Sequence, residues 1–173
     1  MNQRLLRKTL THAPLLLGLL SQTAYLAHAA DTSPEPAPTR AAAAAAPADR
    51  LATARALIAS DKWVAAIDEL KRVGDSGSAD WNNLMGYSHR KARKPDHAAA
   101  ERYYNEALRI DPQHRGALEY SGELYLTLGD LAKAEARLAA LGRACAQPCA
   151  EQTTLQHAIA AYKANGNKPV QTR

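Results

Sequence analysis

The chain has 173 residues, of which 38 are alanine and none is phenylalanine. This length allows one domain of ordinary size with appendages and excludes a large multidomain enzyme. Alanine is the best helix former, whereas strands favour β-branched and aromatic side chains, so the composition argues against a β-sandwich or barrel. The formal net charge of +5 leaves nucleic acids and membrane surfaces open as partners until the charges are located.

Residues 1–29 have the layout of a secretory signal peptide. Arg4, Arg7 and Lys8 form a basic start, an apolar stretch follows, and the small residues Ala27 and Ala29 precede a cleavage site. The apolar stretch is shorter than the roughly 20 residues that span a bilayer, so we expect a bacterial protein that is periplasmic or secreted, without stable membrane insertion after cleavage. Cleavage removes three positive residues and no negative one, which lowers the net charge from +5 to +2.

Residues 30–47 are rich in alanine and proline, including the six-alanine run 41–46. Such a stretch has no large apolar side chain to bury, so we expect a disordered linker. We also expect a flexible tail over residues 166–173.

Residues 48–165 follow the period of amphipathic helices, as in Leu131, Ala134, Leu138 and Leu141. Turn signals interrupt this pattern at regular places, which predicts seven helices of about 11 to 15 residues joined by short turns. Such turns produce antiparallel helix pairs. The sequence therefore predicts an all-α fold.

Two of these helix pairs can be aligned with each other, with Gly86 and Gly122 at equivalent places. The residues that carry the shared pattern are Met85, Gly86, Ala100, Tyr104, Ala107 and Pro112 in the middle pair and Gly122, Tyr125, Gly129, Ala134, Leu138 and Leu141 in the third. A weaker version in the first pair comprises Ala54, Leu57, Trp63, Ala66, Ile67, Leu70 and Val73. The pattern resembles the tetratricopeptide repeat (TPR) family, whose unit is a helix-turn-helix of about 34 residues.

The resemblance implies an α-solenoid of about three helical hairpins, over residues 48–78, 79–114 and 115–146, with a capping helix over 151–164. We expect Gly86 and Gly122 to lie where two helices approach closely, because glycine is small. We expect the larger Leu70, Tyr104 and Leu138 to fill the gaps between units. Pro112 is expected to start the first helix of the third hairpin.

TPR proteins hold peptides or protein segments in a concave groove lined by the first helix of each hairpin, which implies an exported protein–protein interaction module, an adaptor or assembly factor. Basic residues of the middle hairpin facing acidic residues of the third would give the groove opposite ends, suited to an extended peptide. The residues expected to line it are Arg55, Asn83, Tyr87, Arg90, Lys91, Glu119 and Glu123.

Cys145 and Cys149 stand in the turn before the capping helix. In an exported protein the simplest interpretation is a structural disulfide that holds the cap. The alternative function is a metal- or thiol-handling periplasmic protein, in which the two thiols and His157 would hold Cu(I) or carry out redox chemistry.

The histidines that remain after export, His89, His97, His114 and His157, are not spaced as metal ligands or general-base pairs, and we expect solvated surface residues. No catalytic or phosphate-binding motif is present in the sequence, so we expect no enzymatic activity, no metal and no cofactor. The basic cluster over residues 89–94 has no interleaved aromatics, which favours a solvated surface or a protein partner, acidic in character, over nucleic acid. Self-association through the groove is a further hypothesis.

Overall fold

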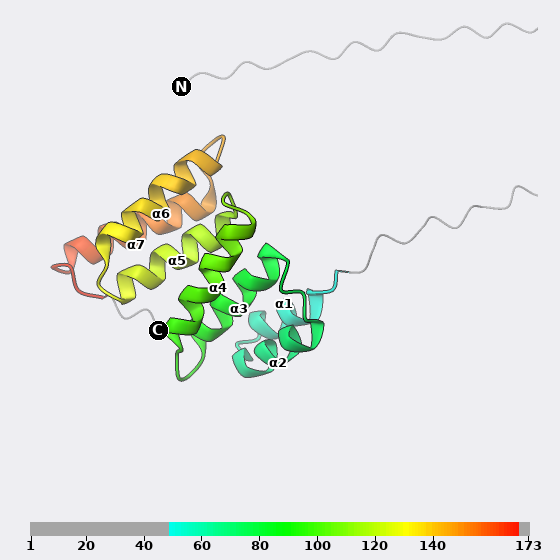
Figure 1. Ribbon diagram of the computed structural model, residues 1–173. Helices are drawn as coiled ribbons and strands as arrows, with labels where there is room; N and C mark the ends of the chain where they lie inside the picture. Colours follow the sequence, from blue (N-terminus) through cyan, green and yellow to red (C-terminus); the bar gives the residue numbers. More distant parts are fainter. Residues whose placement is uncertain (1–48, 170–173) are drawn as a thin grey trace, which may run out of the picture. The chain divides into compact units, whose positions relative to one another are not determined.

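The computed structural model describes residues 49–169, which contain seven helices and no strand, with 73% of the residues helical (Figure 1). This confirms the predicted all-α class. The predicted signal peptide, the predicted linker and residues 170–173 of the predicted tail lie outside the described residues. Within residues 49–169, every helix is too short or too polar to cross a membrane. The helices are α1 (Ala52–Ala59), α2 (Trp63–Val73), α3 (Ala79–Lys91), α4 (His97–Ile110), α5 (Arg115–Thr127), α6 (Leu131–Ala144) and α7 (Ala150–Ala164).

Side-chain caps fix where several helices begin. Ser78, Asp96 and Asp130 each accept a hydrogen bond from a backbone amide in the first turn of α3, α4 and α6, respectively. The turn before α6 is made by Gly129, whose φ of 81° lies in the left-handed region that favours glycine. Helix α1 has 8 residues, fewer than predicted, because it begins only at Ala52. The turn after it includes Asp61, whose φ is 56°.

Consecutive helices pair as hairpins, with α1 on α2, α3 on α4 and α5 on α6, and α7 packs on both α5 and α6. Two glycines permit close helix contacts. A Cβ on Gly86 would lie 2.7 Å from the ring of Tyr104, and a Cβ on Gly122 would lie 2.5 Å from Leu155. Leu138 is partly buried and packs against the core cluster that includes Leu155, whereas Leu155 of α7 occupies the space against Gly122.

Helix α5 begins three residues later than predicted. Pro112 lies in the preceding turn, and the N-cap is His114, whose Nδ1 accepts a hydrogen bond from the amide of Ala117. The other ring nitrogen of His114 lies 2.9 Å from Asp80, at the start of α3, and Asp80 also accepts a hydrogen bond from Arg55 of α1. The prediction of a solvated His114 was wrong, because the residue caps α5 and links it to α3.

The structure contains the predicted disulfide between Cys145 and Cys149. Cys145 is the C-cap of α6 and Cys149 is the N-cap of α7. The bond therefore ties the end of the third hairpin to the start of the capping helix.

Candidate functional site

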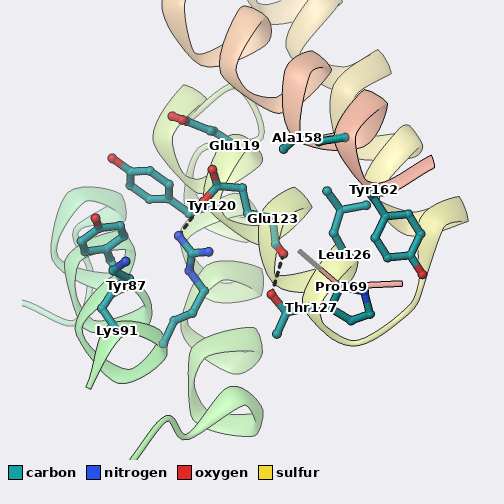
Figure 2. Close-up of a pocket in the computed structure, with 12 residues that line it drawn as sticks. Tyr87, Lys91, Glu119, Tyr120, Glu123, Leu126, Thr127, Ala158, Tyr162 and Pro169 are labelled. Carbon is teal, nitrogen blue, oxygen red and sulfur yellow. Dashed lines mark hydrogen bonds and ion pairs between the residues drawn. The ribbon is translucent and has the colours of Figure 1, made fainter. Parts of the chain in front are cut away.

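A pocket of about 460 Å³ is lined by residues of α3, α5 and α7 and by Pro169, which follows α7 (Figure 2). In this view Tyr87 and Tyr120 lie on one side, Leu126 and Tyr162 on the other, and Glu123 between them. Its volume falls in the range of ligand-binding clefts. The lining residues are Tyr87, Arg90, Lys91, Glu119, Tyr120, Glu123, Leu126, Thr127, Ala158, Ala161, Tyr162 and Pro169.

Arg90 is fixed inside the pocket wall by three neighbours. One of its terminal nitrogens donates a hydrogen bond of 2.7 Å to Glu123, across from α3 to α5. Its guanidinium lies 5.5 Å from the ring centre of Tyr87 and 5.8 Å from that of Tyr120, which are cation–π distances. The side chain is 12% exposed. Arg90 is thus a structural residue with a compensated charge, and the prediction of a solvated basic cluster was wrong at this position.

The pairing also corrects the prediction of a groove with opposite ends. Arg90 of the middle hairpin and Glu123 of the third contact each other directly, so their charges cancel where the two hairpins meet. Lys91 is exposed at the pocket and supplies a basic charge there.

Glu119 is the unpartnered acid of the pocket. Only 8% of the residue is exposed, it lines the pocket, and within residues 49–169 its carboxyl group forms no hydrogen bond or ion pair. Burial, with repulsion from Glu123 and Glu151, raises the pKa of Glu119 to about 7, although Arg90 counteracts part of the shift. At neutral pH this carboxyl group is therefore divided between its neutral and ionised forms.

Tyr87 and Tyr120 remain uncharged at neutral pH. Burial is the main cause that raises the pKa of Tyr120 to about 12 and raises that of Tyr87 as well. The two rings contact each other, with centres 4.6 Å apart. Together with Tyr162, which is buried on α7, they give the pocket three aromatic side chains, a residue type enriched in protein interfaces.

Five of the seven predicted groove residues line this pocket: Tyr87, Arg90, Lys91, Glu119 and Glu123. Arg55 lies outside it, where it pairs with Asp80 and Asp49. Asn83 also lies outside it and is buried, and its amide nitrogen would lie 3.1 Å from a Cβ on Gly116.

The sequence interpretation missed the wall that α7 contributes, formed by Ala158, Ala161 and Tyr162. The sequence predicts this helix only as a cap on the end of the solenoid. The spacing of Ala158 and Tyr162 after Leu155 places them on one helix face, and this was the signal available. Tyr120 was missed because the family pattern points to its neighbours, Glu119 and Glu123.

A second hollow of about 520 Å³ lies at the start of α2. Lys91 lines both hollows. The other residues that line the second hollow are Asp61, Lys62, Trp63, Val64, Ala65 and Arg93, and Val64 is 67% exposed. The two hollows therefore adjoin at a single basic side chain.

The metal- or thiol-handling alternative needs free thiolates at Cys145 and Cys149. In the structure both sulfur atoms are consumed by the disulfide, and His157 is exposed on α7. No observation in the described part of the chain favours that alternative.

A family model of the tetratricopeptide repeat matches residues 94–159. The match supports a TPR family. It extends from the turn before α4 into α7 and includes Glu119, Tyr120 and Glu123. Together with the seven helices it fits an all-α solenoid of helical hairpins, and it suggests a protein–protein interaction module. Searches of curated proteins and of solved structures found no match.

Proposed function

We propose that this protein is an exported interaction module, an adaptor or assembly factor, that holds an extended segment of a partner protein in the pocket between α3, α5 and α7. The observation that carries the proposal is the pocket itself, which is lined by the first helices of the second and third hairpins and by the capping helix, and which combines three tyrosines with charged groups. Tyrosine provides large contact areas at low entropic cost, which is why it is frequent at interfaces.

The adjoining second hollow supports an extended ligand over a compact one. A segment that fills the first pocket and passes Lys91 would reach the hollow beside Trp63 and Val64. Exposed apolar surface such as that of Val64 is typical of interaction sites when it adjoins a polar rim.

Site-specific photo-crosslinking tests this proposal. A photoreactive amino acid at Ala161, on the pocket wall of α7, should capture the partner in cells. The same amino acid at Gln156, which is exposed on α7 and outside the pocket, is the matched control. Capture of one defined protein at Ala161 and not at Gln156 supports the proposal. Equal capture at both positions, or none at Ala161, contradicts it.

Lys91 gives a second test that leaves the fold intact, because it is exposed and its charge lies at the pocket. Reversal by Lys91→Glu should weaken capture from Ala161. Arg90 is unsuitable for this purpose, since its buried ion pair with Glu123 makes loss of binding indistinguishable from loss of structure.

Export is proposed from the sequence of residues 1–29. Intact mass measurement on protein from the periplasmic fraction should give a chain that begins at Ala30. Replacement of Leu16 and Leu17 by arginine should abolish export, because charges in the apolar stretch prevent its recognition. If the wild-type protein, like the arginine variant, stayed at full length in the cytosol, the proposal would be contradicted.

A further inference from the structure

The most informative group outside the contacts described above is the Glu119 carboxyl group. The residue is nine-tenths buried and lines the pocket, and its carboxyl group lacks a hydrogen-bond or ion-pair partner among the described residues. Burying an ionisable group without a compensating partner is costly. Such a group in a cavity wall is better explained by a ligand that completes it than by a contribution to the fold.

The same pocket contains a second carboxylate, and this one does have a partner. Glu123, one helical turn along α5, is satisfied by Arg90, whose guanidinium lies near the faces of Tyr87 and Tyr120. The local chemistry therefore pairs a carboxylate with a guanidinium beside tyrosine rings. Glu119 has the carboxylate and the neighbouring Tyr120, without the guanidinium.

From this juxtaposition we infer that the pocket receives a basic side chain of the partner segment, arginine above all, whose cationic group pairs with the Glu119 carboxylate beside the tyrosine rings. The inference rests on the proposed function and names the chemistry of the segment that it binds. Arginine fits better than lysine, because its planar guanidinium binds carboxylates through two parallel hydrogen bonds and stacks on aromatic faces.

An acidic side chain is the opposite possibility, and the geometry disfavours it. The charge of Arg90 is already matched by Glu123 at 2.7 Å, so an incoming carboxylate would have to displace Glu123 and would lie close to Glu119. Lys91 opposes a cation, but it is exposed, and solvent and salt screen its charge more than that of buried Glu119.

The groups that face Glu119 define how pH should act on this contact. They are Glu123 and Tyr120 on α5, Arg90 and Tyr87 on α3, and Glu151 on α7. Because the pKa of Glu119 is raised to about 7, binding of a cation should be accompanied by loss of its proton near neutral pH. The affinity should therefore decrease about ten-fold or more from pH 8 to pH 5.

Selection from a library of random ten-residue peptides, displayed on phage, tests the inference. The immobilised baits are the mature protein, its Glu119→Gln variant and Asp68→Asn. The last is the matched control, because Asp68 is an exposed acid of α2 outside both hollows. We expect arginine or lysine enriched at one position with the wild type and Asp68→Asn, and no such enrichment with Glu119→Gln. Peptides without a basic preference, or the same preference with Glu119→Gln, would overturn the inference and leave the proposed function standing.

Failure to select any peptide would count against the proposed function, and a second measurement then decides the inference alone. Carbon-13 NMR of the Glu119 side chain follows titration with N-acetyl-arginine amide and with the uncharged N-acetyl-citrulline amide. The arginine compound should shift the carboxyl resonance and move its titration midpoint to lower pH, with citrulline at least about ten-fold weaker. Equal effects of the two compounds, or no effect of either, would overturn the inference.

Discussion

Gly122 of α5 and Leu155 of α7 are packed so closely that a Cβ on Gly122 would lie 2.5 Å from Leu155 Cδ2 and 2.7 Å from Cδ1. Leu155 is fully buried, so it has little room to move away. This contact holds the capping helix against the third hairpin and thereby positions the α7 wall of the pocket.

Gly122→Ala should therefore lower the free energy of unfolding by about 1 to 3 kcal/mol, the usual cost of overpacking a core. The control is Gly142→Ala in α6, where the new Cβ would meet only Gln152 at 3.5 Å. That variant should be neutral or slightly stabilising, because alanine is the better helix former. Urea unfolding provides the measurement, and equal effects of the two substitutions would refute this account of the contact.

Removal of Arg90 should be costly in itself. Arg90→Met leaves Glu123 part-buried without its partner, and we expect a loss of about 2 to 4 kcal/mol. The double variant Arg90→Met/Glu123→Gln should recover a large part of that loss, since no unpaired charge remains. Urea unfolding of both single variants and the double variant gives the coupling between the two residues. A double variant as unstable as the sum of the single variants would show that the ion pair carries no coupling.

The pKa of Glu119 predicts a pH dependence of stability. Below about pH 4.5 the carboxyl group is protonated in both the folded and the unfolded chain. Between pH 4.5 and 7 the folded chain retains the proton that the unfolded chain has lost, so the free energy of unfolding falls as pH rises through this window. Above pH 7 the penalty is complete.

Glu119→Gln should accordingly stabilise the protein at pH 8, by about 1 to 3 kcal/mol, and have little effect at pH 4. The difference from the wild type is the quantity to measure, because His89 acts in the opposite direction. Burial lowers the pKa of His89, so its contribution is lost as pH falls. A pH-independent effect of Glu119→Gln would exclude the assigned titration.

His114 offers a test of helix capping. His114→Ala removes the acceptor for the amide of Ala117 and the contact with Asp80, and should cost about 1 kcal/mol. His114→Asn keeps a side-chain cap and should lose less. If alanine and asparagine at this position gave the same thermal midpoint, the capping role would have to be abandoned.

The disulfide should stabilise the native state by about 2 kcal/mol, as expected from loop entropy for so short a loop. The double variant Cys145→Ser/Cys149→Ser should melt at lower temperature than the oxidised wild type. A reducing agent should lower the midpoint of the wild type and leave that of the double variant unchanged. Scanning calorimetry makes the comparison, and a wild type indifferent to the reductant would contradict a stabilising role.

The period of apolar residues was sufficient to predict the helices, because burial of one face is a local property of each helix. The close contact at Gly86 was also predictable, since a small residue faces the large Tyr104 in the next helix. The start of α5 was not, because histidine is an uncommon N-cap and the capping depends on its own rotamer. Proline at position 112 gave the more familiar signal and was misleading.

The pocket was predictable on the α3 and α5 sides, where the repeat pattern identifies first helices. The burial of Arg90 was not, because it depends on Glu123 and the two tyrosines meeting across different hairpins. Glu119 likewise has no partner because Arg90 pairs with Glu123. The sequence therefore identifies the charged side chains of the pocket, whereas the packing of the hairpins determines which of them form ion pairs.

The walls of the pocket come from α3, α5 and α7, whereas α3 and α7 do not pack on each other among the described helices. In a repeat array each unit is normally coupled only to its neighbours. A ligand that contacts α3 and α7 at once would add a direct coupling between two units that are otherwise connected only through α5, and it would stabilise both by mass action. Occupation of the pocket should thus make unfolding of the array more nearly all-or-none, so that the bound segment acts as an additional tie along the solenoid.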